Sequence, residues 1–217
     1  MTGPAASAVI FDMDGVLVDS GAHHRAAWRA LLDELGVVPA EPDYWRLTIG
    51  RPSIEAVALL LGRETSWAEA QRLAARKQEH YRRLASEGPA LVRGVAEFVA
   101  GLAAQRVPRA VATSASRHDV EVLLTRSGLR DRFEVVVAAE DVRRGKPDPE
   151  VYLLAAHRLG VAPERCLVFE DAVVGVQAAR SAGMRAIGVS TAHTETELRA
   201  AGAERAVEDF EGLSWPV

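Results

Sequence analysis

The chain has 217 residues, enough for one sizeable core with a smaller second domain. Its 26 cationic and 30 acidic side chains give a formal charge of -4, which argues against a basic nucleic-acid surface or a polybasic membrane patch. No apolar run approaches the roughly 18 residues that span a bilayer, and residues 1–7 lack a cationic segment before an apolar stretch. We therefore expect a cytoplasmic protein without nucleic-acid or membrane partners.

Residues 9–20 predict a buried strand that ends in two carboxylates, Asp12 and Asp14, followed by Gly15. Two like charges this close are costly near an apolar interior unless a cation or a reaction requires them. An ordinary Asp-Gly turn is the alternative. This motif by itself does not decide between the two.

Residues 19–91 predict a compact helical insert. A helix with Trp28 and Leu31 on its apolar face ends before Gly36, and a second helix begins with Ser53 as its cap and ends at Gly62. The pattern Ser-Trp-Ala-Glu at 66–69 is typical of a helix start, and this third helix runs to about residue 86.

From residue 92 onward the pattern alternates between helix and strand. Four further apolar strands are predicted, and the tail from about residue 194 is weakly patterned; the strands lie at 109–113, 135–138, 166–169 and 186–189. Strands separated by helices favour a parallel α/β sheet covered on both faces. The predicted domains are an α/β core at 1–18 and 92–217 and a helical domain at 19–91.

Ligands of such sheets bind at the carboxyl ends of the strands, so the residues that follow each strand are the candidate site. Taken singly, each of these residues has an ordinary alternative as a turn, a helix cap or a solvated charge. Their occurrence in order, each at a strand end, favours a shared site. The candidates are Asp12, Asp14, Thr113, Ser114, Lys146, Glu170 and Asp171.

This set of side chains suits phosphoryl transfer. Carboxylates of Asp12 and Asp171, with a backbone carbonyl, offer the hard oxygen ligands that Mg²⁺ prefers. Lys146 and the metal would offset the charge that repels an anionic nucleophile from a phosphate, and Ser114 could hold a phosphate oxygen. One carboxylate can attack phosphorus while a second transfers protons.

The four motifs together resemble those of the haloacid dehalogenase superfamily: residues 12–15, Thr113-Ser114, Lys146-Pro147-Asp148-Pro149 and Glu170-Asp171. The insert is similar to the cap of its phosphatase and beta-phosphoglucomutase branch. The resemblance implies a Rossmann-like core and an aspartyl-phosphate intermediate, with a cap that closes by hinges near 18–20 and 90–94. It implies Asp12 as nucleophile, Asp14 as general acid and base, and Ser114 and Lys146 as phosphate holders. It also implies Mg²⁺ bound by Asp12, the carbonyl of Asp14, and Asp171 with Glu170 in support.

Within this branch the sequence favours a phosphatase that acts on a small phosphorylated metabolite, first of all a sugar phosphate. Dehalogenases of the family do not need the second acid, Asp14, and the phosphonate-cleaving relatives use a lysine earlier in the cap than Lys77. A mutase of the beta-phosphoglucomutase type remains the alternative. Its pattern would place an arginine near position 53, where this chain has Ser53, although Arg51 lies close by.

Substrate specificity would come from residues that face the site. Each candidate for this role could instead be an ordinary surface residue. A purely regulatory or binding role would require the loss of a catalytic position, and none is lost. A monomer is favoured, although the sequence leaves the oligomeric state open. Cys166, the one cysteine, is expected to be a buried structural thiol, and Lys77 and Lys146 are the chain's lysines. The substrate-binding candidates are His24, Arg51, Lys77, Ala115 and His118.

Overall fold

The computed structural model describes residues 6–39 and 41–217. The expectations that concern residues 1–5, namely the N-terminal segment and the beginning of the core domain, lie outside the described residues, as does position 40 of the helical insert.

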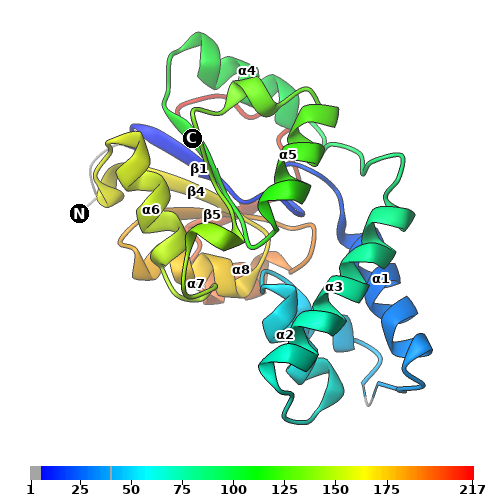
Figure 1. Cartoon of the computed structure of the whole chain (residues 1–217). Coiled ribbons are helices and arrows are strands. Elements are labelled where there is room, and N and C mark those ends of the chain that lie inside the picture. The colour runs from blue at the N-terminus through cyan, green and yellow to red at the C-terminus, as the bar shows by residue number, and fades with distance from the viewer. Residues whose placement is uncertain (1–5, 40) are drawn as a thin grey trace.

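The core is one sheet of six parallel strands in the order β3-β2-β1-β4-β5-β6. Its centre is the strand that carries the first acidic motif, paired with β2 on one side and β4 on the other (Figure 1). The strands are β1 (Ala8–Phe11), β2 (Arg109–Ala112), β3 (Val135–Val137), β4 (Cys166–Glu170), β5 (Arg185–Val189) and β6 (Arg205–Val207).

Helices cover both faces of this sheet. Alternate residues of β1 point to opposite faces, so that Val9 and Phe11 join one apolar cluster while Ala8 and Ile10 join the other. The first cluster is completed by α4 (Val95–Ala104) and α5 (Arg117–Arg126), and the second by α6 (Glu150–Leu159), α7 (Val173–Ser181) and α8 (Glu195–Ala200). Short 3-10 turns complete the core: η2 (Arg130–Arg132), η3 (Ala139–Asp141) and η4 (Pro163–Arg165).

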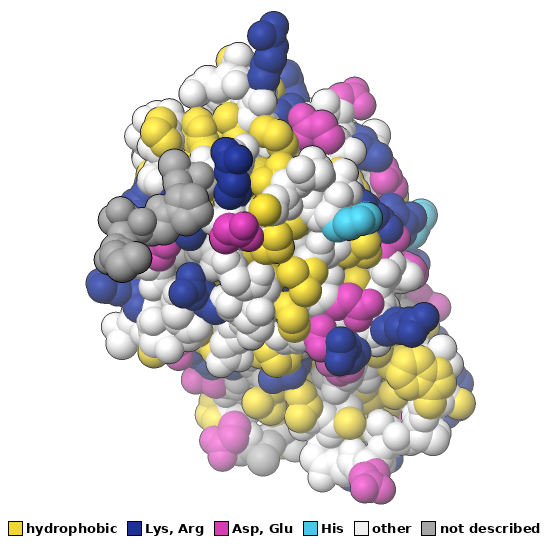
Figure 2. Space-filling view, turned by 90° about the vertical axis from the view of Figure 1, so that its left-hand side faces the viewer, with side chains coloured by type: hydrophobic (Ala, Val, Ile, Leu, Met, Phe, Trp, Pro, Cys, Tyr) yellow, Lys and Arg dark blue, Asp and Glu magenta, His cyan; other side chains and the backbone are white. Residues whose placement is uncertain are grey.

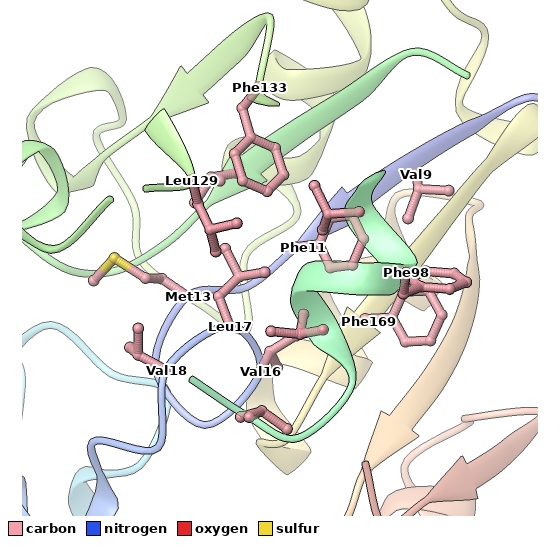
Figure 3. Packing of buried hydrophobic residues seen from close by; sticks show 14 of the residues in the cluster. Val9, Phe11, Met13, Val16, Leu17, Val18, Phe98, Leu129, Phe133 and Phe169 are labelled. Carbon is pink, nitrogen blue, oxygen red and sulfur yellow. The ribbon is translucent and has the colours of Figure 1, made fainter. Parts of the chain in front are cut away.

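Aromatic side chains fill the first cluster directly beneath the acidic motif. Phe11 stacks on Phe169 of the neighbouring strand, with ring centroids 5.4 Å apart, and the edges of Phe98 and Phe133 face the Phe11 ring. Figure 3 shows these rings together with the side chains of the turn that follows β1. The carboxyl end of β1 therefore rests on a closely packed apolar base.

The insert has its helices between residues 21 and 84, to one side of the sheet (Figure 1). Its core is a separate small apolar cluster with Trp28, Leu31 and Val57 at its centre. The elements are α1 (Gly21–Glu34), η1 (Tyr44–Thr48), α2 (Ser53–Leu61) and α3 (Trp67–Leu84).

The two segments that join the insert to the core run side by side. The backbone N–H of Asp19 donates to Ala90 at 2.8 Å, and that of Val92 donates to Leu17 at 3.1 Å. These segments coincide with the hinge regions expected from the family resemblance, at 18–20 and 90–94. They hold the insert close to the end of β1.

Two local predictions were wrong. The sequence indicated five strands and a weakly patterned tail, whereas the tail forms α8 and the sixth strand β6. Ser53 does not cap α2, because it is the first helical residue and Pro52 occupies the capping position without a side-chain bond. Ser66 does cap α3, where its hydroxyl accepts the backbone N–H of Glu69.

None of the helices among residues 6–39 and 41–217 combines the length and apolar character needed to cross a membrane. On the face shown in Figure 2, cationic and anionic side chains are interspersed. Cys166 is buried as expected, and burial raises the pKa of its thiol to about 11, which leaves it a poor nucleophile at neutral pH.

Candidate active site

The turn after β1 presents both aspartates at the carboxyl edge of the sheet. The backbone N–H of Asp12 still pairs with Phe169 of β4 at 3.0 Å, and the chain then curls back so that Gly15 pairs with Val18 at 2.8 Å. Gly15 has a φ of 76°, a conformation that favours glycine. Since Met13 lies fully buried in the aromatic cluster, the carboxylates on either side of it are held toward the edge of the sheet.

Lys146 lies between two carboxylates beneath the site. Its ammonium nitrogen is 2.7 Å from Oδ1 of Asp12 and 2.6 Å from Oε1 of Glu170, and the side chain is buried. It also lies 4.9 Å from the centre of the Tyr152 ring. A buried cation needs such partners, so Lys146 is fixed next to Asp12 rather than solvated.

Glu170 is held by the protein on both of its oxygens. Oε1 accepts from Lys146 and from the hydroxyl of Tyr152 at 3.1 Å, and Oε2 accepts from the backbone N–H of Ala172 at 2.6 Å. A Cβ at Gly175 would lie 1.7 Å from Oε1, so only glycine lets α7 approach this carboxylate. Glu170 therefore serves first to hold Lys146.

Asp12, Glu170 and Asp171 each offer a carboxylate oxygen, and these oxygens lie within 4.8 Å of one another. This donor set consists of hard oxygens alone and fits Mg²⁺ better than a softer ion such as Zn²⁺. Because both oxygens of Glu170 already accept hydrogen bonds, Asp12 and Asp171 are the carboxylates most available to a cation.

Asp14 faces a different group of side chains, which the insert supplies. Its Oδ1 accepts from the hydroxyl of Ser20 at 2.5 Å and lies 3.1 Å from Nε2 of His24. Nδ1 of His24 lies 2.7 Å from the ammonium nitrogen of Lys77. The insert thus positions the second aspartate, whereas the core positions the first.

Aromatic rings surround the buried ammonium group of Lys77. The nitrogen lies 5.1 Å from the centre of the Trp28 ring and 5.3 Å from that of Tyr81, and Tyr81 stacks on His24 at 4.2 Å. Both lysines of this arginine-rich chain are therefore buried at the candidate site.

The two aspartates have opposite pKa shifts. Burial raises the pKa of Asp12 to about 7, against the lowering effect of Lys146. Burial also acts to raise the pKa of Asp14, but His24 and the Ser20 hydroxyl outweigh it and lower that pKa. Groups with such separated pKa values are typical of a site that divides chemical roles between two carboxylates.

A cavity of about 760 Å³ lies between the insert and the edge of the sheet, and most of the predicted site residues line it. Lys146 and Glu170 do not line it and lie beneath Asp12. His118 is exposed and does not line the cavity either, so the structure does not bring it to the other candidates. The predicted residues that line the cavity are Asp12, Asp14, His24, Arg51, Lys77, Thr113, Ser114, Ala115 and Asp171.

Two contacts between insert and core were missed at the sequence level. The hydroxyl of Ser114 donates to the carbonyl of Gly50 at 3.0 Å, although its predicted partner was a phosphate oxygen. Asp119 of α5 accepts from Arg82 at 2.8 Å and from Gln78 at 3.0 Å, both in α3. The sequence does show an acidic residue, Asp119, soon after the strand predicted at 109–113. Its partners could not be predicted, because they lie on a helix that is far away in the sequence.

Comparison with known proteins identifies the family. A profile of haloacid dehalogenase-like hydrolases matches residues 6–183. The chain belongs to this family. Membership confirms the resemblance drawn from the four motifs and the expected enzyme class, and the α/β fold with its parallel sheet is confirmed by the structure.

Relatives of this haloacid dehalogenase-like hydrolase include named phosphatases. The chain is 35% identical over 209 residues to the validoxylamine A 7'-phosphate phosphatase of Streptomyces hygroscopicus, which covers 95% of each chain. It is 38% identical over 183 residues to the fructose-1-phosphate phosphatase YqaB of Escherichia coli, covering 83% of this chain and 95% of that one. Among solved structures, beta-phosphoglucomutase of Clostridium difficile superposes with a TM-score of 0.86 at 25% identity, covering 97% of this chain and 94% of that one.

Proposed function

We propose that the protein is a Mg²⁺-dependent phosphatase that hydrolyses a small phosphorylated carbohydrate through an aspartyl-phosphate intermediate. The observation that carries the proposal is the position of Asp12, which lines the cavity while its Oδ1 is held 2.7 Å from buried Lys146. The kinds of substrate printed in the names of its relatives support a phosphorylated sugar.

In the first step, an oxygen of Asp12 forms a bond to phosphorus and the bond from phosphorus to the ester oxygen breaks. The leaving oxygen takes a proton from Asp14, whose pKa rises when the negative phosphate enters the cavity. Lys146 stays next to Asp12 and offsets the negative charge that gathers there.

In the second step, Asp14 accepts a proton from a water molecule as the water oxygen bonds to phosphorus. The bond from phosphorus to Asp12 then breaks, which releases inorganic phosphate and restores the Asp12 carboxylate and the protonated Asp14. His24 and Ser20 keep Asp14 oriented toward the cavity through their contacts with Oδ1. Asp12 thus carries the phosphoryl group between the two steps, while Asp14 acts as the acid in the first step and as the base in the second.

Asp12 and Asp171, supported by Glu170 and joined by the backbone carbonyl of Asp14, would hold the Mg²⁺. When bound, the ion polarises a phosphate oxygen and neutralises part of the charge on the transferring group. Ser114 and the neighbouring backbone N–H groups would bind a further phosphate oxygen. Within the cavity, His24, Arg51, Lys77 and Ala115 would contact or orient the remainder of the substrate.

A phosphosugar mutase is the second candidate, because Arg51 lines the cavity and its guanidinium forms no ion pair with the described residues. The structural similarity to a beta-phosphoglucomutase also favours it. Against it, the first residue of α2 is Ser53, where the mutase pattern has arginine, so the cationic group for a second phosphate would have to come from Arg51.

Phosphorus NMR on the purified protein with Mg²⁺ and a panel of sugar phosphates separates the two candidates. The panel includes beta-glucose 1-phosphate with a trace of glucose 1,6-bisphosphate. Steady release of inorganic phosphate is expected. Formation of glucose 6-phosphate without comparable free phosphate would assign the mutase reaction instead.

A cytoplasmic, monomeric enzyme remains our expectation, and the domain division at 1–18, 19–91 and 92–217 is proposed with it. The paired segments around Val18 and Leu91 support these boundaries, because they form the two covalent links between insert and sheet.

A further inference from the structure

The loop between β5 and α8 reaches across the edge of the sheet and contacts the turns after β1 and β4. The hydroxyl oxygen of Thr191 lies 2.6 Å from the carbonyl oxygen of Gly15 and 3.3 Å from Oδ2 of Asp171. Nδ1 of His193 lies 3.0 Å from the backbone carbonyl oxygen of Asp171. This loop, at the carboxyl end of β5 (Figure 1), joins two motifs that are more than 150 residues apart in the chain.

Gly15 packs closely against the Asp171 carboxylate. A Cβ at position 15 would lie 1.9 Å from Oδ2 of Asp171 and 2.9 Å from the Thr191 hydroxyl oxygen. The carboxylate therefore rests against the backbone of the Gly15 turn, with the Thr191 hydroxyl beside both. Its orientation is restricted by these two neighbours.

We propose that Thr191 and His193 are positioning residues for Asp171, and that they tune the affinity of the acidic cluster for a divalent cation. The inference rests on the proposed function, in which Asp12 and Asp171 hold Mg²⁺. Groups that orient a metal-binding carboxylate through hydrogen bonds typically change metal affinity by 10- to 100-fold. Thr191 would orient the carboxylate, and His193 the backbone from which that carboxylate extends.

The Thr191 hydroxyl is suited to this task because it has one hydrogen and two acceptors within reach. At 2.6 Å it donates to the carbonyl of Gly15, and rotation about its C–O bond directs the same hydrogen toward Asp171. The first arrangement bonds this loop to the first motif, and the second bonds it to the Asp171 carboxylate of the fourth motif. Serine would keep this hydroxyl, whereas valine has the shape of threonine without it.

The test is a titration of the purified full-length enzyme with Mn²⁺, a spectroscopic substitute for Mg²⁺, in which free ion is measured by electron paramagnetic resonance. Thr191→Val should weaken Mn²⁺ binding about 10- to 100-fold, and Thr191→Ser should stay within about threefold of the wild type. Thr125→Val, which changes an exposed threonine on α5, is the matched control and should bind as the wild type does. His193→Ala provides an independent variant and should also bind Mn²⁺ more weakly.

A kinetic readout accompanies the titration. The Mg²⁺ concentration that gives half-maximal hydrolysis should rise in Thr191→Val by a similar factor, while kcat at saturating Mg²⁺ recovers most of the wild-type value. General damage to the fold would instead lower kcat at all Mg²⁺ concentrations.

Wild-type Mn²⁺ affinity in both Thr191→Val and His193→Ala would overturn the inference while leaving the proposed function in place. Equal losses in Thr191→Ser and Thr191→Val would also overturn it, since the hydroxyl would then not be the responsible group. Unchanged Mn²⁺ affinity in Asp171→Asn would contradict the proposed function itself, because it would show that Asp171 does not bind the cation.

Discussion

The ammonium group of Lys77 donates to Nδ1 of His24 across 2.7 Å, and this contact determines the state of the histidine ring. An ammonium group can only donate, so Nδ1 must accept and the ring hydrogen resides on Nε2, from which it is donated to Asp14. Burial and the neighbouring Lys77 both lower the pKa of His24, which keeps the ring neutral. The insert therefore acts on the second aspartate through a ring held in one tautomer.

Lys77 should make the stability of the protein depend on pH in the alkaline range. Burial lowers the pKa of its ammonium group from 10.5 to about 8, so the unfolded chain binds more protons than the folded protein between these values. The free energy of unfolding should then rise with pH across this interval, by about 3 kcal/mol relative to Lys77→Met, in which this titration is absent. Urea unfolding of both proteins from pH 7 to 10.5 measures the difference, and parallel curves would contradict the shift.

Replacement of Asp12 should separate catalysis from folding. We expect Asp12→Asn to lose activity by at least about a thousandfold, because an amide does not provide the attacking oxygen. The variant should remain folded, since burial disfavours the charge of Asp12 in the folded state and the amide removes that charge. Steady-state kinetics with circular dichroism checks both points, and substantial residual turnover would refute the role of Asp12 as nucleophile.

The two buried lysines should differ in their effect on a minimal phosphate ester. Lys146 contacts Asp12 directly, whereas Lys77 contacts only His24 and the rings around it. With p-nitrophenyl phosphate, Lys146→Met should lower kcat/KM by about a hundredfold or more, and Lys77→Met by about tenfold or less. Losses of equal size would mean that one of the lysines has been assigned to the wrong part of the site.

Removal of divalent cations should abolish activity, and added Mg²⁺ should restore it, because Lys146 alone would not offset the combined negative charge of Asp12, Asp171 and the phosphate. Mg²⁺ should also raise the unfolding temperature of the wild type, since a ligand that binds only the folded state stabilises it. Asp171→Asn is the control and should show a much smaller rise. Full activity in excess chelator would exclude a metal-dependent reaction.

The central part of the site could be predicted because short-range patterns encode it. Apolar strands that end in polar residues, separated by helices, must form a parallel sheet whose carboxyl ends meet at one edge. Asp12, Lys146 and Glu170 come together for this reason. The contacts of Lys77 and Thr191 depend instead on how the insert and a late loop pack against that edge, and no local pattern encodes such packing.

The errors have similar physical origins. β6 has only three residues, and each of them is partly or fully exposed, so it lacks the apolar run that marked the other strands. The helix before it had an available signal, because Thr194 and Glu197 form a complete capping box. At α2, the sequence offered Ser53 as a plausible cap, but Pro52 already stands in the extended backbone conformation from which the helix starts.

The stacking of Phe11 on Phe169 has a consequence for how such an enzyme can change. The two rings sit opposite each other in the β1–β4 ladder, and the next residues in the two strands are Asp12 and Glu170. Hydrocarbon packing below the sheet edge thus sets the spacing of the reactive carboxylates, and the insert has its own apolar cluster. Selection for a new substrate can therefore reshape much of residues 19–91 while the spacing of Asp12 and Glu170 is inherited intact.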